Sequence, residues 1–426
     1  MKVIFIIITV IVLIDFLCNI INYFSAKNAF KNKKKKLHKD KSNMYILLPV
    51  YKEEKIAEVM VDRFYKLSKE TNIKTIIITT VKEKSNKTHK IIENKIKREK
   101  LYDYIKLIKC DIKDGTMATQ LNYGLEYLNK IDKSNYIFGI HNADGQITKE
   151  HIEFVKNNID ERTCIQSYSY FKYNGNILLN GAISWQNRWS YIFEAGRCNL
   201  KLGKSALFKK MNYVIGHGLY MKASCIKDCG YFPEDTINED EFLGVILNYK
   251  KYNIIPMPYL EEAEFAPNAR VYIKQQSVWY NGPKMSFNYL KRIITNTKNV
   301  RYERNIYNKS IKDFINLFII CFKLFLHAIY WISAVYILFI LYSYVSYKLF
   351  GIYGILYVII INYLNLLLFN YLSYKQIVKE TNDKFRFPIL ELPITFYFIH
   401  SFGPIINVIR SVLGKNTIKN KYKTER

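Results

Sequence analysis

The sequence lacks the features of a small secreted scaffold. Its seven cysteines are an odd number without paired spacing, so they form no disulfide framework and predict reduced thiols in a reducing compartment. Cys225 and Cys229 stand four residues apart without a suitably spaced His or Cys pair, which favours packing over metal binding. No internal repeat or low-complexity linker divides the 426 residues, and half of them are apolar, which excludes a disordered chain.

Acidic residues are scarce relative to basic ones. The chain has 36 Asp and Glu against 64 Lys and Arg, a formal net charge of +28. The basic residues are scattered, no nucleic-acid-binding motif accompanies them, and their densest group, at residues 27–41, directly follows an apolar run. This distribution predicts no nucleic-acid partner and favours attraction to anionic lipid, at about 1 kcal/mol per basic residue near the surface.

Three apolar runs are long enough to cross a bilayer, at residues 3–24, 325–347 and 352–372. The first is too long for the core of a signal peptide and no small-residue cleavage site follows it, so residues 1–26 are expected to be an uncleaved transmembrane anchor. The eight lysines that follow it predict that this anchor leaves the membrane on the cytoplasmic side.

The remaining topology follows from that orientation. Residues 43–300 contain no spanning run and are expected to fold as one cytosolic domain. Residues 311–414 are expected to form a membrane region with two spans and a re-entrant or interfacial hairpin over 388–412, where a Gly-Pro pair breaks the apolar stretch. The basic tail, residues 415–426, would then lie in the cytosol. The prediction is a multi-pass protein of the cell membrane with a cytoplasmic catalytic domain.

Within the cytosolic block, apolar β-rich runs alternate with helical patterns. Strands are predicted at residues 45–50, 75–81, 104–109, 136–141 and 163–168, and helices at residues 53–69, 86–100, 116–130 and 148–158. This alternation predicts an α/β fold with a mostly parallel sheet that helices cover on both faces. Ligands of such sheets bind at the carboxyl ends of the strands.

Polar motifs follow several of these strands. The first strand runs into PVYKEE (residues 49–54), the fourth into HNADG (141–145), and INEDEFLG (237–244) places three acids at the start of a helix. Each motif alone is equally typical of a helix start or a surface turn.

Together and in order, the motifs resemble the membrane-embedded family 2 glycosyltransferases, the class that includes cellulose, chitin and hyaluronan synthases. The resemblance runs through YILLPVYKEE (45–54), MATQLNYG (117–124), HNADG (141–145), GHGLYMKASCIKDCGYF (216–232), INEDEFLG (237–244) and KQQSVWYNG (274–282). It implies a GT-A fold and inverting transfer of a sugar from a nucleotide-sugar donor. The assignment of uridine as the donor's nucleoside comes from the family alone.

The resemblance gives Asp144 the role of metal and donor ligand. In the family, the last acid of an Asp-x-Asp pattern meets a Mg²⁺ or Mn²⁺ ion that stabilises the leaving diphosphate as a Lewis acid. That acid falls on Asp144. Asn142 replaces the first acid of the pattern, and its amide oxygen is a weaker ligand than a carboxylate. Both residues are expected to contact the donor. An Asp-Gly turn is the structural alternative.

The resemblance also implies the catalytic base. Asn238-Glu239-Asp240 occupies the place of a Thr-Glu-Asp motif, whose Asp takes the proton of the attacking acceptor hydroxyl. Asp240 is therefore the expected base. Glu239 is expected at the helix start or on the acceptor side, and Glu241 is expected to face solvent.

A Gln-x-x-Arg-Trp motif of the family contacts the donor diphosphate and the acceptor sugar. Gln275 or Gln276, then Val278 and Trp279, match it, but the arginine is missing. Trp279 offers an apolar face to a sugar ring or is an ordinary buried aromatic. Loss of the guanidinium removes a bidentate phosphate ligand, which weakens the case for processive polymerisation.

Further donor contacts are expected where the first two strands end. Pro49, Tyr51 and Glu53 follow the first strand. After the second strand, Thr80 is expected to replace the family's contact to the nucleotide base and Glu83 its contact to the ribose, with surface polarity as the alternative.

One histidine and one group of aromatic residues are further candidates for the acceptor site. His217 falls where the family has a small-residue loop near the acceptor, and a satisfied loop histidine is favoured over a ligand or base. Trp185, Trp189 and Tyr191 suit either a sugar platform or one packed helical face, and the packed face is favoured.

The sequence thus predicts an inverting hexosyl or N-acetylhexosaminyl transferase with a lipid-linked or polysaccharide acceptor. With three spans, single transfer to an envelope glycan is at least as well supported as polymer export, although a homo-oligomer would be able to build a pore. The alternatives are a non-catalytic partner subunit, motivated by Asn142 and Val278, and a basic membrane scaffold that binds anionic lipid.

Overall fold

The computed structural model describes residues 1–33, 40–172, 177–200, 213–296, 302, 306–307, 310–333, 337–383, 386–395 and 399–414. The predicted basic tail, residues 415–426, and part of the basic segment 27–41 lie outside the described residues.

The strands and helices have the following bounds. The strands are β1 (Met44–Pro49), β2 (Lys74–Thr80), β3 (Ile105–Cys110), β4 (Ile137–Ile140), β5 (Thr163–Phe171), β6 (Leu219–Lys222) and β7 (Asn253–Ala263). The helices before β6 are α1 (Lys2–Lys31), α2 (Ala57–Thr71), α3 (Lys87–Glu99), α4 (Met117–Ile131), α5 (Lys149–Asn158), α6 (Ile177–Arg188), the π-helix η1 (Trp189–Ala195) and α7 (Gly196–Asn199). After β6 come α8 (Ala223–Asp228), α9 (Glu239–Tyr249), α10 (Ala269–Lys284), α11 (Ser286–Ile294), α12 (Ile311–Ser333), α13 (Phe339–Phe350), α14 (Ile352–Thr381), α15 (Glu391–Thr395) and α16 (Phe402–Val412).

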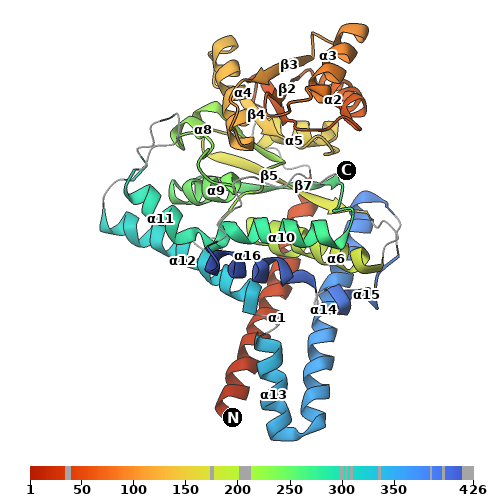
Figure 1. Ribbon diagram of the computed structural model, residues 1–426, viewed down its shortest axis with the longest axis vertical. Helices are drawn as coiled ribbons and strands as arrows, with labels where there is room; N and C mark the ends of the chain where they lie inside the picture. The colour runs from red at the N-terminus through yellow and green to blue at the C-terminus, as the bar shows by residue number, and fades with distance from the viewer. Residues whose placement is uncertain are drawn as a thin grey trace.

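The strands form one mixed sheet in the order β3-β2-β1-β4-β6-β5-β7 (Figure 1). Strand β6 is antiparallel to both of its neighbours, β4 and β5. All other neighbouring strands in the sheet are parallel. The predicted α/β class with a mostly parallel sheet is therefore confirmed. The five predicted strands and four predicted helices of residues 45–168 are present with small shifts at their ends.

Helices cover both faces of the sheet, because alternate side chains of each strand point to opposite sides. On one face, Ile46 and Ile77 pack in a core cluster with Phe64 of α2. On the other face, Leu47 packs in a second cluster with Leu121 of α4. This two-sided burial fixes the register of the sheet and aligns the ends of β1, β2 and β4 along one edge.

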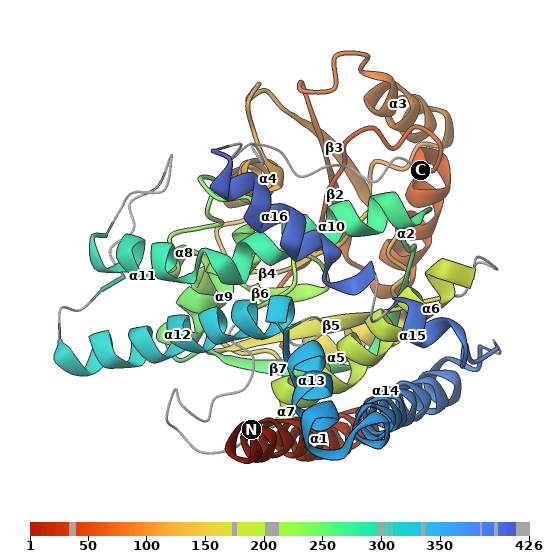
Figure 2. The same ribbon diagram turned by 60° about the horizontal axis from the view of Figure 1, so that its bottom comes forward.

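Three described helices are long and apolar enough to cross a membrane, namely α1, α12 and α14. Helices α1, α13 and α14 project together from one end of the molecule, whereas α12 lies across their direction (Figures 1 and 2). The span predicted over residues 325–347 falls partly on α12, which ends at Ser333, and partly on α13, which begins at Phe339; residues 334–336 lie outside the described residues, and the two helices run in different directions (Figure 2). Hydropathy alone missed that one face of α12 packs into the core of the protein.

The apolar C-terminal stretch is divided between α15 and α16. In both views α16 runs alongside α10. The Asn407 amide donates to the Ser277 carbonyl at 2.8 Å and accepts from Lys284 Nζ at 2.9 Å. A Cβ at Gly403 would lie 2.6 Å from the Ile273 carbonyl oxygen, so the helices touch closely there. An interfacial hairpin in this stretch remains a prediction.

Candidate active site

The predicted site residues, except Glu83, line one cavity. Its volume is about 550 Å³, within the range of about 300–1,000 Å³ of small-molecule sites. The lining includes Pro49, Tyr51, Glu53, Thr80, Asn142, Asp144, His217, Glu239, Asp240, Gln275, Gln276 and Trp279. The fold therefore brings together side chains from the carboxyl ends of β1, β2 and β4, the start of α9, and α10.

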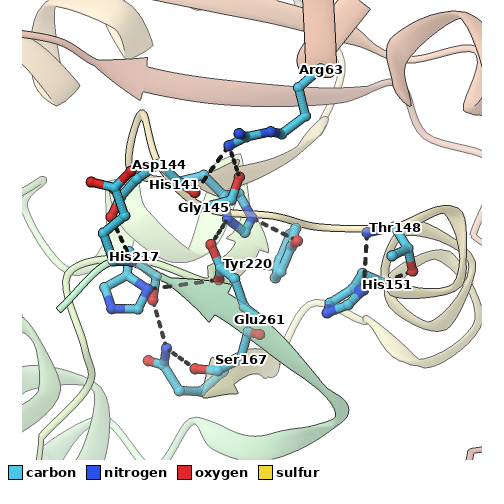
Figure 3. Close-up of polar contacts among 12 residues, drawn as sticks. Arg63, His141, Asp144, Gly145, Thr148, His151, Ser167, His217, Tyr220 and Glu261 are labelled. Carbon is cyan, nitrogen blue, oxygen red and sulfur yellow. Dashed lines mark hydrogen bonds and ion pairs between the residues drawn. The ribbon is translucent and has the colours of Figure 1, made fainter. Parts of the chain in front are cut away.

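Asp144 lies in the loop that follows β4, and its position is fixed from two sides (Figure 3). Its Oδ2 accepts from the Glu264 backbone N–H at 3.2 Å. From α2, Arg63 Nη1 donates to the carbonyl oxygens of Asp144 and Gly145 at 3.0 and 3.1 Å. An Asp-Gly turn is thus present, and it presents the carboxylate to the cavity.

Below this loop lies a buried acid that the sequence reasoning did not identify. Glu261 of β7 places Oε1 3.1 Å from His141 Nδ1 and Oε2 3.7 Å from His217 Nδ1. His141 Nε2 lies 2.7 Å from the Tyr220 hydroxyl. Burial opposes ionisation, but the two histidines hold the pKa of Glu261 well below its usual range. The signal in the sequence was a pair of acids, Glu261 and Glu262, after an apolar stretch of the same strand.

The loop that carries His217 is held by one glutamine. Gln166 accepts from the Ile215 backbone N–H at 2.9 Å and donates to the His217 carbonyl at 2.8 Å. Gly218 has a φ of +64°, and a Cβ there would meet Ser167 Cβ at 2.6 Å, so glycine is required. His217 is a paired loop histidine, as favoured, and it also faces the cavity.

The acids of α9 differ in exposure. Glu239 is buried, while Asp240 is partly exposed and accepts from the Glu241 backbone N–H through Oδ1 at 3.0 Å. A Cβ at Gly216 would lie 2.9 Å from Asp240 Oδ2, so the histidine loop closely approaches this carboxylate.

The expectation that Glu241 faces solvent is wrong. The side chain is buried against α10, at Gly282, where a Cβ would overlap its carboxylate. Burial, with the charge of Asp240 beside it, raises the pKa of Glu241 well above its usual value. The contact joins segments some forty residues apart, which a helix-face argument does not detect.

Helix α10 supplies the side of the cavity nearest the apolar helices. Gln276 and Val278 are buried, whereas Trp279 is 40% exposed, so Trp279 is not an ordinary buried aromatic. Among the aromatic trio, Trp185 and Trp189 line the cavity, while Tyr191 is buried against Phe30 with ring centroids 5.0 Å apart. The favoured packing holds for all three residues, because Trp185 and Trp189 also share a hydrophobic cluster with Leu366, but Tyr191 belongs to the main core cluster, so the three do not form a single face.

At the end of β2, Thr80 is buried at the cavity wall. Glu83 is also buried, which excludes surface polarity, and its carboxylate accepts from the backbone N–H groups of Lys52 and Thr88 at 2.9 and 2.8 Å. Lys82, which the sequence reasoning passed over, lines the cavity and donates to the Gly115 carbonyl at 3.3 Å.

A second unpredicted acid is Glu194 of η1. It is buried at the cavity wall and accepts from the Tyr213 hydroxyl at 3.2 Å. Burial raises the pKa of Glu194 to about 7, although the hydrogen bond from Tyr213 opposes the shift. No motif marked this residue, because its environment is made by distant segments.

The oxygen donors of the cavity fit a hard divalent cation that is shared with a ligand. Among the described residues, no group of three His, Cys, Asp or Glu side chains is placed to hold a metal. Mg²⁺-type sites commonly use one or two carboxylates together with substrate phosphates and water. The Asp144 carboxylate and the Asn142 amide oxygen suit that arrangement, not a preformed protein cage.

Among solved structures, the chain is similar to the mannosyltransferase PcManGT from Pyrobaculum calidifontis in complex with GDP-Man and Mn²⁺. The TM-score is 0.52 at 14% sequence identity, covering 97% of this chain and 99% of that chain. The sheet is of GT-A type. The GT-A sheet here is joined to long apolar helices.

Weaker similarity extends to glucosyl-3-phosphoglycerate synthase from Mycobacterium tuberculosis in complex with Mn²⁺, uridine diphosphate and phosphoglyceric acid. Its TM-score is 0.32 at 9% identity, covering 56% of this chain and 77% of that chain. No protein-family model and no curated protein matches the sequence.

Proposed function

We propose that the protein is a membrane-anchored inverting glycosyltransferase that moves a sugar from a nucleotide-sugar donor to a lipid-linked or polysaccharide acceptor. The observation that carries this proposal is the meeting of Asp144 and Asp240 in one cavity of a GT-A sheet. The two carboxylates come from the end of β4 and the start of α9. A transferred sugar would therefore have Asp144 on the side of the donor diphosphate and Asp240 on the side of the acceptor hydroxyl.

The donor belongs at the ends of β1, β2 and β4. Ligands of open α/β sheets bind at these carboxyl ends, where Tyr51, Thr80 and Lys82 line the cavity. A bound Mg²⁺ or Mn²⁺ ion would be held by Asp144 and Asn142 with the donor diphosphate, and would stabilise the charge of the leaving group. The motif resemblance favours a uridine nucleotide, and the PcManGT complex contains GDP-Man, so both nucleotides belong in the donor test.

Asp240 is the proposed base. The acceptor hydroxyl oxygen forms a bond to the anomeric carbon, its proton passes to Asp240, and the bond from the anomeric carbon to the diphosphate oxygen breaks. The nucleoside diphosphate leaves with that electron pair. Glu241 is not the proposed base, because its side chain is buried against Gly282, where burial raises its pKa.

The acceptor side of the cavity adjoins the apolar helices. Besides Trp279, the lining includes His327, Tyr330 and Trp331 of α12, a helix long and apolar enough to span a membrane. Aromatic faces of this kind suit sugar rings. An acceptor that resides in the membrane therefore reaches the cavity without crossing bulk water.

The test is a panel of UDP-sugars and GDP-sugars against the purified full chain with Mn²⁺, following donor binding and nucleoside diphosphate release. Asp240→Asn is expected to keep donor binding and to lose at least about 100-fold in release, because general-base catalysis contributes about 10²–10⁴. Asp103→Asn changes an exposed carboxylate and is the matched control. An Asp240→Asn variant with normal turnover would refute the proposed base.

A non-catalytic partner subunit is the second candidate. It is favoured by Val278, which is buried at the cavity wall where the motif would place an arginine. Donor binding without release, in the wild-type chain and with every acceptor offered, would support this candidate over the enzyme.

A further inference from the structure

A second, smaller cavity of about 130 Å³ adjoins the first. It lies among α1, η1, α12, α13 and α14, of which α1, α13 and α14 project together from one end of the molecule (Figure 1). The two cavities share the lining residues Trp185, Trp189, His327 and Tyr330. A ligand that occupies both would therefore reach from the apolar helices to the catalytic carboxylates.

Three buried polar atoms on the wall of this small cavity have no hydrogen-bond partner among the described residues. They are Arg188 Nε, His327 Nε2 and Asn365 Oδ1. They come from α6, α12 and α14, so no single local turn explains them. Buried polar groups of folded proteins are almost always paired with protein, water or ligand, and convergence on one cavity points to an occupant.

Arg188 gives the cavity its charge. Its side chain is 8% exposed, and Nη2 donates to Asn19 Oδ1 at 2.8 Å. The guanidinium carbon lies 4.5 Å from the Trp185 ring centroid. Asp15, the acid on this wall, is one step away, because Asn19 Nδ2 donates to Asp15 Oδ2 at 3.0 Å. The guanidinium therefore meets a neutral amide directly and retains N–H groups for an anion.

The remaining walls are mostly apolar, although Asn362 and Tyr342 also line the cavity. Ile8, Ile11, Val12 and Leu366 line the cavity, and the outer faces of α1 and α14 expose large apolar side chains such as Leu13 and Leu364. Polar and charged groups within membrane helices are costly and commonly mark ligand paths. An inorganic anion would bind the guanidinium but would make no apolar contacts with these walls. A neutral lipid would contact the walls but would not pair with the guanidinium.

We propose that Arg188 binds the phosphate of an amphiphilic acceptor whose hydrocarbon chain lies against α1, α13 and α14. This inference rests on the proposed function and narrows its acceptor. A carboxylate base serves a hydroxyl nucleophile, and Trp185 and Trp189 lie on the wall common to both cavities. The acceptor class is therefore a lipid-phosphate-linked sugar, with its phosphate at Arg188 and a sugar hydroxyl at Asp240.

The binding test needs no nucleotide sugar. The full chain in phosphatidylcholine nanodiscs is titrated with decyl phosphate, decanol and inorganic phosphate, following thermal unfolding and tryptophan fluorescence. Two of the four tryptophans, Trp185 and Trp189, line the cavity. We expect saturable binding of decyl phosphate alone. The proposal would be overturned if decanol bound as tightly as decyl phosphate, if inorganic phosphate alone bound, or if none of the three ligands bound.

Variants locate the site. Arg188→Gln is expected to weaken decyl phosphate binding at least tenfold and Arg188→Lys less, because lysine keeps the charge but not the planar fork. His327→Phe, which removes an unpartnered ring nitrogen able to donate to a phosphate oxygen and keeps the contact between Arg188 and Asn19, is expected to weaken binding should Arg188→Gln fail to fold. Arg162→Gln is the control, because it also removes an arginine charge but changes an exposed side chain that does not line the cavity. Unchanged affinity in both cavity variants would refute the site.

Turnover separates this inference from the proposed function. With an active wild type, Arg188→Gln should raise KM at least tenfold for a decyl-phosphate-linked sugar and leave KM for the matching decyl glycoside unchanged. Equal effects on both acceptors would refute the phosphate site while the transferase stands. Decyl phosphate binding that depends on Arg188 in a chain without transfer would support the site and count against the transferase.

Discussion

At the residue scale, the chemistry of the cavity is set by burial as much as by residue type. Asp240 and Glu241 are neighbours on α9, yet one is partly exposed and the other is buried with a raised pKa. Glu261 is buried too, but two histidines keep its pKa low. The pKa values of Glu241 and Glu261 are therefore shifted in opposite directions within one site.

Glu194 should make stability depend on pH. Its pKa is raised from 4.5 to about 7, so the folded state holds a proton that the unfolded state releases. Stability contributed by this proton is full below about pH 4.5 and is lost as the pH rises to about 7. Glu194→Gln should therefore gain on the order of 3 kcal/mol over wild type at pH 8 and nothing at pH 4. Thermal unfolding across pH measures this, with the exposed Glu153→Gln as control; equal gains at both pH values would contradict it.

Asp144 should make metal and nucleotide binding depend on each other. Because the described residues offer no three-ligand cage, Mn²⁺ alone should bind weakly, and a nucleoside diphosphate should bind at least tenfold more tightly with Mn²⁺ than with EDTA. Asp144→Asn should lose this enhancement and keep the metal-free affinity. Calorimetry with and without Mn²⁺ checks the expectation, and tight Mn²⁺ binding in the absence of nucleotide would argue for a different site.

At the element scale, local pattern predicted the sheet up to β5, and long-range contacts decided the rest. The five predicted strands have clear apolar runs and turn signals. Strand β6 has four residues and joins the sheet antiparallel between β4 and β5, so its pairing is fixed by tertiary contacts. The site residues on β1, β4 and α9 were predictable from ordered motifs, whereas Glu194 and Glu261 gain their roles from neighbours far along the chain.

The contact of α16 with α10 supports the part of the cavity that carries Trp279. A Cβ at Gly403 would lie 2.6 Å from the Ile273 carbonyl and from the Ser277 backbone nitrogen. These are backbone atoms, so Gly403→Ala should force the helices apart and cost about 1–3 kcal/mol. The melting temperature should fall and KM for acceptor should rise. Val412→Ala, at an exposed position of the same helix, should change neither, and a Gly403→Ala variant with wild-type stability would exclude the close contact.

At the scale of the whole molecule, α1 is part of the folded core as well as an apolar projection. Its last turns place Ala26 and Phe30 in the main core cluster. Asn199 donates to the Ser25 carbonyl at 2.9 Å, and a Cβ at Gly196 would lie 2.3 Å from the Asn22 carbonyl oxygen. The sheet and the apolar helices are thereby joined as one body, which would keep the proposed acceptor in line with the proposed base, Asp240.

This union predicts opposite outcomes for two phenylalanines of one helix. Phe30 is 2% exposed and stacks on Tyr191, whereas Phe24 is 60% exposed. Phe30→Ala should lose about 3–5 kcal/mol, as truncation of a buried aromatic does, and lower the melting temperature in detergent. Phe24→Ala should leave it nearly unchanged, because that ring faces outward. If both variants unfolded at the wild-type temperature, α1 would be a detachable anchor, and the alignment of a membrane-held acceptor with Asp240 would need another source.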